Sequence, residues 1–320
     1  MDSFRDSRCA FIDMARLGKT GAGACVRAVL VCVVVYLTLS VVSGSVLGAY
    51  LGFYKAAFHH VAPVAPFTQM IVIAIGSAAL FIAVRRATRR TLGRPLLSLV
   101  SVDMTFRPGR VVLGAALWLA ASLLLVAVGM LVQRWLSPGQ QGAIAVNFHW
   151  PTGRTQMIAL ILFAAIFPFQ TAIEELVFRG ALTQNLGQFV RSRWVLALII
   201  ALLFAAAHGK RGWPNFCYYV VLSLGGTAVS LSDERLELAM GAHFMNNLWA
   251  STLVLLFSGH ASGVGVPSVV THASWLALIP NALRYLLILA LVRATNLLSW
   301  QRALPGDVEQ LAARMARARR

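Results

Sequence analysis

Long apolar runs, separated by short polar segments, set the pattern of this chain. Eight of them are long enough, or nearly so, to cross a hydrocarbon core of about 30 Å. They lie at 28–53, 65–84, 111–133, 157–184, 194–210, 213–231, 239–257 and 274–292. Repeated runs of this length predict an all-α fold, a polytopic transmembrane helical bundle of about eight spans, because a helix satisfies its backbone polar groups inside lipid.

The composition agrees with a membrane protein and excludes a soluble globular domain. Hydrophobic residues make up 58% of the 320 positions and charged residues only 12%, about half the charge of a soluble chain. The four cysteines are scattered and show no C-x-x-C spacing. Neither a disulfide framework nor a cysteine metal site is therefore expected.

The formal net charge of +17 does not indicate a nucleic-acid partner, because the basic residues cluster between the apolar runs. There they act as topology signals and contact anionic lipid headgroups. With the N-terminus inside, the inner segments hold 21 basic residues and the outer segments five, which predicts that both termini are cytosolic. Arginine outnumbers lysine by 25 to three, as in GC-rich genomes, so we expect a bacterial plasma (inner) membrane.

Three basic segments are expected to contact the membrane surface. Residues 1–27 combine five basic residues with spaced apolar ones and fit a short interfacial helix. The loop at 85–110 holds seven arginines and is the strongest inner block. The C-terminal tail, 294–320, is basic and ends in an Ala/Arg-rich stretch typical of an amphipathic surface helix.

Two acidic residues, Glu174 and Glu175, stand side by side in the fourth apolar run. A carboxylate at membrane depth costs several kcal/mol unless it is paired, wetted or protonated. Glu175 and Arg179 are separated by four residues and share a helical face, with the acid in the favourable N-terminal position. Glu174 points about 100° away, at the angle between successive helical residues. We therefore expect Glu175 to pair with Arg179 and Glu174 to be available for chemistry.

Two later runs each carry a polar pair at the same spacing. Phe204 and His208 share one face of their helix, and His243 and Asn247 share one face of another. A lone histidine in an apolar helix is more often a hydrogen-bonded core residue than a functional one. Three helices that each present such a group favour a single shared site. The other five histidines fall in outer loops or span ends and receive no role: His59, His60, His149, His260 and His272.

The motifs Glu-Glu-x-x-x-Arg, Phe-x-x-x-His and His-x-x-x-Asn, in this order on successive membrane helices, resemble the CPBP family of intramembrane proteases. This family is also called Abi and includes the CAAX prenyl endopeptidases. The resemblance covers 155–257, which we expect to be the catalytic core, between a family-variable transmembrane region at 28–154 and a last span within 258–293. It implies an endopeptidase that acts on a membrane-associated or prenyl/CAAX-like substrate.

The resemblance also implies a role for each motif residue. Glu174 would activate the hydrolytic water and His208 would help to hold it, while His243 and Asn247 would stabilise the oxyanion. Glu175, Arg179 and Phe204 would support the site. Amide hydrolysis requires such a base and such donors. The expected partners are membrane lipids and a peptide or protein substrate at the cytosolic side, because the glutamates lie in the inner half of their span.

The participation of a metal is an open alternative. One carboxylate and two histidines form a legitimate Zn²⁺ ligand set, and here those residues would be Glu174, His208 and His243. The chain has no H-E-x-x-H motif of the zincin type. The same groups can act without metal, and this glutamate-dependent mechanism is the one we favour.

Two rival functions use the same residues. A non-enzymatic protein of the same fold, such as a bacteriocin-immunity or scaffold protein, is opposed by the intact motifs. An ion-coupled transporter that uses Glu174 and Glu175 is opposed by the lack of an internal repeat. Arg284, in the middle of the last run, has no assigned role. Two alternatives stay open for Arg284. It pairs with a carboxylate across the bundle, or it snorkels along a polar seam.

Overall fold

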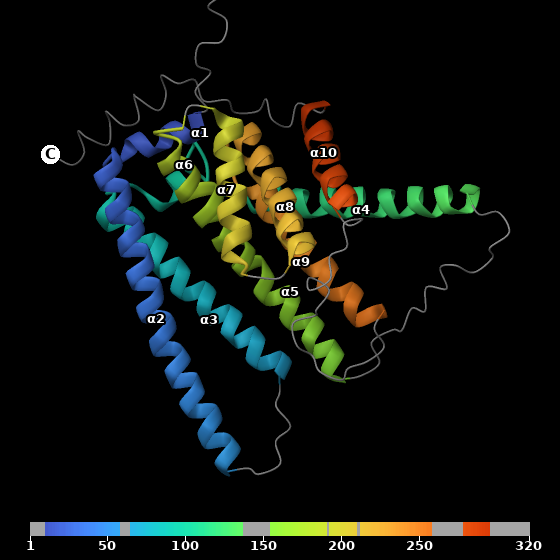
Figure 1. Ribbon diagram of the computed structural model, residues 1–320, viewed down its shortest axis with the longest axis horizontal. Coiled ribbons are helices and arrows are strands. Elements are labelled where there is room, and N and C mark those ends of the chain that lie inside the picture. Colours follow the sequence, from blue (N-terminus) through green and yellow to red (C-terminus); the bar gives the residue numbers. More distant parts are fainter. Residues whose placement is uncertain are drawn as a thin grey trace, which may run out of the picture.

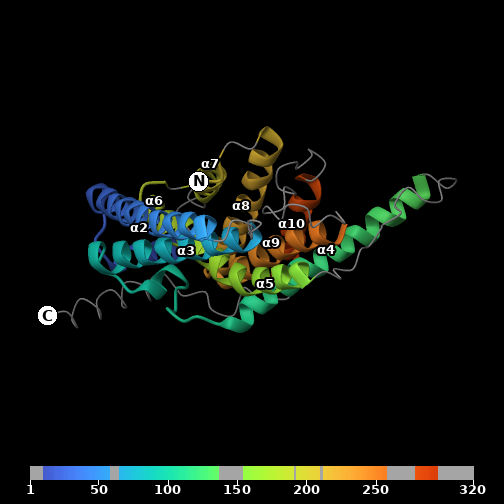
Figure 2. The same ribbon diagram turned by 90° about the horizontal axis from the view of Figure 1, so that it is seen from below.

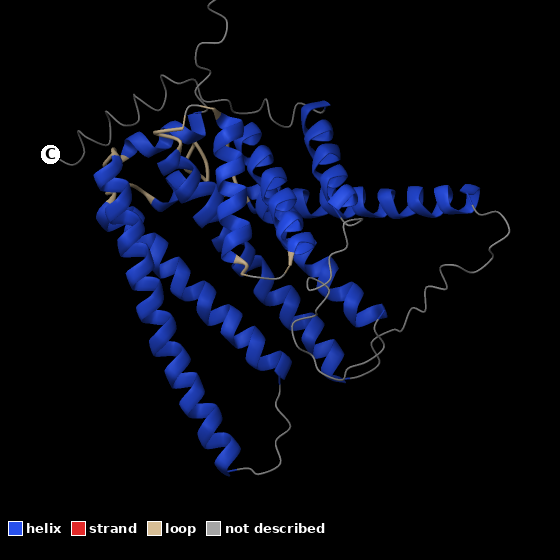
Figure 3. Ribbon diagram, viewed as in Figure 1, coloured by secondary structure: helices blue, strands red, loops and turns tan. Residues whose placement is uncertain are grey.

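The computed structural model describes residues 10–57, 65–136, 154–190, 192–209, 212–257 and 278–294. Within these ranges the chain forms helices and no strand, as Figures 1, 2 and 3 show. The long helices are α2 (Ala22–Ala57), α3 (Ala65–Arg86), α4 (Pro108–Leu136), α5 (Arg154–Glu175), α7 (Arg193–Ala207), α8 (Trp213–Asp233), α9 (Glu237–Phe257) and α10 (Leu278–Ala294). The short ones are α1 (Ala10–Asp13), η1 (Met14–Leu17), η2 (Ala87–Thr91), η3 (Leu96–Leu99), η4 (Leu176–Leu182) and α6 (Thr183–Leu186).

Each of the eight predicted runs corresponds to one helix, so the all-α prediction is confirmed. Among the described residues, four segments are long and apolar enough to cross a membrane: Ala22–Gly52, Met70–Thr91, Pro108–Leu136 and Met157–Leu186. The run at 194–210, one of those expected to be long enough or nearly so to cross the membrane, forms a shorter apolar helix. Helix α7 has 15 residues and rises about 22 Å, because it ends before His208 and the chain turns at Gly209, whose φ is +77°.

The helices pack in two layers (Figures 1 and 2). In the first layer α2, α3, α5, α9 and α4 each pack against the next. In the second layer α8 packs between α7 and α10 and also contacts α9. Helix α4 crosses its neighbours steeply, and its C-terminal half projects from the bundle in both views.

Polar and apolar side chains are distributed as in a membrane protein. Large apolar residues face outward, among them Val34 and Val41 of α2 and Leu131 of α4, which are 61%, 66% and 67% exposed. The charged side chains of Glu175 and Arg179 are buried. An apolar exterior of this extent requires a lipid environment, because soluble monomers rarely expose large contiguous apolar patches. The chain is a helical membrane protein.

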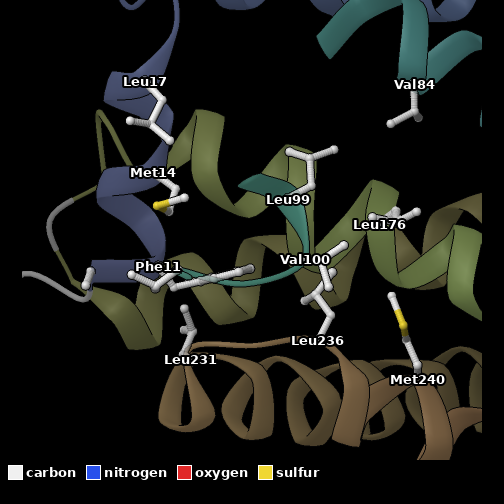
Figure 4. Packing of buried hydrophobic residues seen from close by; sticks show 12 residues of the cluster. Phe11, Met14, Leu17, Val84, Leu99, Val100, Leu176, Leu231, Leu236 and Met240 are labelled. Atoms are coloured by element: carbon white, nitrogen blue, oxygen red, sulfur yellow. The ribbon is translucent and has the colours of Figure 1, made fainter. Parts of the chain in front are cut away.

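The described part of the N-terminal segment does not form the surface helix predicted from its pattern. Phe11, Met14 and Leu17 are buried in a cluster that also contains Leu99 and Leu236 (Figure 4). The chain turns from α1 through η1 into α2. The apolar side chains of this segment therefore pack inside the bundle and do not face lipid. Residues 1–9, the tail at 295–320 and the five histidines without a role lie outside the described residues.

A network of charged residues closes the same end of the bundle. We call it the clamp and define it as Asp103, Arg110, Asp233, Arg235 and Glu237. Arg235 binds Asp103 at 2.7 Å and Glu237 at 2.7 Å, and Arg110 binds Asp233. Backbone bonds reinforce it, since Leu236 N donates to Val100 O at 2.9 Å. The clamp joins the loop before α4 to the turn between α8 and α9. The distribution of basic residues along the sequence predicts that these two segments lie on the same side of the membrane.

Candidate active site

A cavity of about 520 Å³ lies inside the bundle. Its walls come from α2, α3, α5, α8 and α9 and from the C-terminal end of α7. The sequence motifs contribute four lining residues: Glu174, His208, His243 and Asn247. These are the four residues predicted to be catalytic, and the fold brings them together from two helices, α5 and α9, and from the C-terminal end of α7.

The chain changes its helical geometry immediately after the two glutamates. Residues Leu176–Leu182 form a π-helix, and Thr183 N donates to Phe178 O across five residues. Gly180 lies in this segment, where a Cβ would come within 2.9 Å of Leu99 O, so only glycine allows this close approach. Single π-turns inside α-helices occur frequently at functional sites. The apolar run at 157–184 predicted an uninterrupted span here and carries no signal of the π-turn.

The predicted pair of Glu175 and Arg179 is present. Arg179 Nη1 lies 3.0 Å from Glu175 Oε1, and each side chain is only 1% exposed. The guanidinium also lies 4.5 Å from the centre of the Phe204 ring, which stabilises the cation. A Cβ at Gly226 of α8 would come within 3.1 Å of Arg179 Nη2, so this small residue makes room for the cation.

Glu175 has a second partner that the sequence did not predict. His243 Nδ1 donates to Glu175 Oε1 at 2.8 Å, in a bond that joins α9 to α5. A carboxylate oxygen can only accept, so the hydrogen lies on Nδ1. This bond orients the imidazole and leaves Nε2 directed toward Glu174, whose Oε2 is 3.7 Å away.

The two oxygens of Glu174 differ in their surroundings. Oε1 accepts a short hydrogen bond from Gln170 Nε2, one helical turn earlier. Oε2 is buried and accepts no hydrogen bond from the described part of the chain. The 3.7 Å to His243 Nε2 is too long for a direct hydrogen bond. Glu174 therefore presents one oxygen fixed by a hydrogen bond and one oxygen that is open to a further donor.

His208 lies at the C-terminal end of α7, where its ring is held between two aromatic rings. The centroid of Tyr219 is 4.1 Å away in a stacked arrangement, and that of Phe204 is 4.4 Å away. His208 Nδ1 lies 2.7 Å from the carbonyl oxygen of Phe204 and donates to it, because a carbonyl can only accept. Phe204 thus packs beside both His208 and Arg179.

Several cavity residues escaped the sequence analysis. Three of them bond or stack with the motif residues, namely Gln170, Tyr219 and Asn246, and Tyr218 donates to Asn246. Gln170 could have been found, since it is a polar residue in an apolar run and stands four residues before Glu174. The tyrosines carry no such signal, because aromatic residues in apolar helices are common.

The three ligands of the zinc alternative, Glu174, His208 and His243, all line the cavity. Among the described residues, no three His, Cys, Asp or Glu side chains are grouped so that they could hold a metal ion. His243 Nδ1 donates to Glu175 and His208 Nδ1 donates to the Phe204 carbonyl, and each bond leaves Nε2 as the other ring nitrogen.

Comparison with known proteins identifies the region that contains this site. Residues 154–249 match the family described as "Type II CAAX prenyl endopeptidase Rce1-like", which confirms the resemblance drawn from the three motifs. Over 197 residues the chain is 28% identical to the Bacillus subtilis (strain 168) protein named "Uncharacterized protein YyaK". That match covers 58% of this chain and 60% of the relative's length. No solved structure matches the chain.

Proposed function

We propose that this protein is an intramembrane endopeptidase that hydrolyses a peptide bond of a membrane-associated or prenyl/CAAX-like substrate, with a water activated by Glu174. One observation carries the proposal: Glu174, His208, His243 and Asn247 line one cavity within a membrane bundle. The Rce1-like match over 154–249 supports the same class of reaction.

The reaction begins with a water that lies beside Glu174 Oε2 and His243 Nε2, two atoms 3.7 Å apart. Glu174 takes a proton from this water, and the hydroxide oxygen forms a bond to the scissile carbonyl carbon. His208, which also lines the cavity, helps to hold the water. The protonated Glu174 then gives its proton to the amide nitrogen, the C–N bond breaks, and a carboxylic acid and an amine leave.

The oxyanion of the tetrahedral intermediate is stabilised by α9. Asn247 Nδ2 uses one hydrogen for Gln170 Oε1, at 3.2 Å, and has a second for the substrate. His243 is the second donor: as an imidazolium it gives the hydrogen on Nε2 to the oxyanion and keeps the hydrogen on Nδ1 in its bond to Glu175. Its two nitrogens lie 2.8 Å from Glu175 Oε1 and 3.7 Å from Glu174 Oε2. One oxyanion donor is worth about 10²–10³ in kcat.

The proposal includes a location and an orientation. We place the protein in the bacterial plasma membrane with both termini cytosolic and the cavity open toward the cytosol. The distribution of basic residues, 21 on the inner segments against five on the outer ones, supports this orientation. Reporter fusions at the C-terminus test it, and an external C-terminus contradicts the eight-helix topology.

The central experiment uses the full chain reconstituted in liposomes. A fluorogenic CAAX-type peptide is supplied in lipidated and unlipidated forms, and cleavage is followed for wild type and Glu174→Gln. We expect wild type to cleave at least one form and Glu174→Gln to be inactive while it retains its folded helical spectrum. Equal cleavage by the variant contradicts the mechanism.

A chelator experiment separates the metal-free mechanism from the zinc alternative. Wild-type protein is dialysed against a strong chelator, its metal content is measured, and activity is assayed before and after zinc is returned. We expect activity to persist in the metal-free preparation. Activity that disappears and returns with zinc contradicts the metal-free version.

A further inference from the structure

A continuous chain of hydrogen bonds crosses the cavity wall from α8 to the reactive carboxylate. Tyr218 OH donates to Asn246 Oδ1 at 2.9 Å, and Asn246 Nδ2 donates to Asn247 Oδ1 at 3.2 Å. Asn247 Nδ2 donates to Gln170 Oε1 at 3.2 Å, and Gln170 Nε2 donates to Glu174 Oε1. We call these five residues the amide chain. All five line the cavity.

The direction of the amide chain is determined by its last member. An ionised carboxylate offers no hydrogen, so Gln170 must turn its nitrogen toward Glu174 and its oxygen toward Asn247. Asn247 then points its nitrogen at Gln170 and its oxygen at Asn246. Each amide in turn has one possible orientation, and Tyr218 is left to donate at the far end. The charge of Glu174 thus orders side chains on two other helices.

From this geometry we propose that Gln170 is a positioning residue that holds both the general base Glu174 and the oxyanion donor Asn247, and that the amide chain from Tyr218 maintains its orientation. The inference rests on the proposed endopeptidase function and deepens it. Gln170 occupies Oε1 of Glu174, which keeps Oε2 directed toward His243. It also occupies one hydrogen of the Asn247 amide, which directs the other toward the substrate.

Arg284, which the sequence left without a role, packs against an aromatic ring. Its guanidinium carbon lies 4.9 Å from the centre of the Trp118 ring, which stabilises the cation. The described residues provide no carboxylate partner for it.

The proposal can be tested because an acid can imitate an amide at position 170. In Gln170→Glu, the protonated carboxyl donates to Glu174 through its hydroxyl and accepts from Asn247 through its carbonyl. Once ionised, it repels Glu174 and offers no hydrogen. The neighbouring titratable or charged groups are Glu174 on α5, His208 after α7, Tyr218 and Tyr219 on α8, His243 on α9 and Tyr36 on α2.

The experiment compares Gln170→Leu and Gln170→Glu with wild type in liposomes across a range of pH. We expect Gln170→Leu to lower kcat about 10- to 100-fold at every pH with little change in KM, because the substrate still binds but the reacting groups are misplaced. We expect Gln170→Glu to approach wild-type kcat at acidic pH and to lose activity as the new carboxyl ionises. A merely structural glutamine does not produce this pH-dependent rescue.

The matched control is Gln188→Leu, the same substitution at a glutamine outside the cavity, where Gln188 bonds to Gly21 N and Cys25. We expect its kcat and pH profile to match wild type. Wild-type kcat in Gln170→Leu, or no rescue of Gln170→Glu at acidic pH, overturns the proposal. If Glu174→Gln is inactive in the same assay, the endopeptidase function survives that result.

A second measurement does not depend on activity. The side-chain amide of Gln170 is labelled with ¹⁵N in nanodiscs, and its proton shift is compared with that of Glu174→Ala. We expect the amide proton to move upfield in the variant, because it loses a charge-assisted hydrogen bond. An unchanged shift overturns the amide chain even if no substrate is cleaved.

Discussion

The clamp and the cavity both contain carboxylates in a largely apolar molecule, but they satisfy them differently. In the clamp, Asp103 accepts hydrogen bonds from Ser101, Thr105, Arg107 and Arg235, and Glu237 accepts from Arg235 and Arg107 N. In the cavity, Glu174 Oε2 accepts none from the described residues. The clamp also holds one buried oxygen without a hydrogen-bond partner among the described residues, Asp233 Oδ2, but Asp233 does not line the cavity. Glu174 combines an open acceptor oxygen with a place on the cavity wall. We expect this combination to distinguish a reactive carboxylate from the structural ones of the clamp.

The largest expected effect is the loss of catalysis in Glu174→Gln. Removal of the base lowers kcat by about 10²–10⁴. Because Glu174 Oε2 has no donor to lose, we expect thermal stability in detergent to equal or exceed that of wild type. A clear loss of stability contradicts the contrast between the two regions.

The converse substitution, Glu237→Gln in the clamp, is expected to act on stability alone. Glu237 is fully buried, and the change leaves Arg235 without one of its anionic partners. Breaking a buried ion pair costs about 3–5 kcal/mol. Unfolding titrations in mixed micelles measure this loss, and kcat per folded molecule should stay at the wild-type value. A fall in kcat of the folded fraction shows that the clamp and the cavity are coupled.

A smaller effect is expected for Gly226→Ala, which places a methyl group beside the buried cation Arg179. The new Cβ approaches Arg179 Nη2 to 3.1 Å, so the guanidinium must shift relative to Glu175 and Phe204. Overpacking of this kind costs about 1–3 kcal/mol, and we expect a several-fold fall in kcat. Gly129→Ala is the matched control, since nothing lies within 4 Å of its Cβ. Equal behaviour of the two variants contradicts the tight fit around Arg179.

The smallest effect is a pH dependence in the clamp. Burial alone raises the pKa of Asp103, but hydrogen bonds from Thr105, Ser101 and Arg235 outweigh it and lower the pKa from 3.8 to about 2. A group with a depressed pKa in the folded state contributes stability above its unfolded pKa and loses it as pH falls through the folded one. The contribution should therefore disappear between pH 3.8 and about 2. Asp103→Asn should remove this dependence, which unfolding midpoints at pH 5 and pH 2 measure against wild type.

What the sequence could predict depended on local periodicity. Apolar runs identified every long helix, and the spacing of Glu175 and Arg179 predicted their ion pair, because residues four apart on a helix are neighbours. The order of the three motifs predicted one shared cavity. Contacts between distant segments were missed: the bond from His243 to Glu175, and the burial of Phe11 against Leu236. No local pattern encodes which helices lie side by side.

The length of α7 and the π-turn after Glu175 were missed for a different reason. Both depend on backbone geometry that an apolar run does not reveal. The helix ends at His208 because the chain turns at Gly209, and the π-turn allows Gly180 to approach Leu99 O closely. Hydrophobic periodicity predicts that a helix exists more reliably than it predicts where the helix ends or what its pitch is.

The π-helix at Leu176–Leu182 has a consequence for how the molecule can change. Its wider turns hold about one residue more than an α-helix of the same rise. Removal of one residue there would restore α-helical pitch and leave the residues on either side in nearly their present orientations, because the wide turn already absorbs the extra residue. The same deletion inside the regular helix α5 would rotate the residues on one side of it by about 100° relative to the other. We therefore expect the loss of one residue to disturb the cavity less within Leu176–Leu182 than within α5.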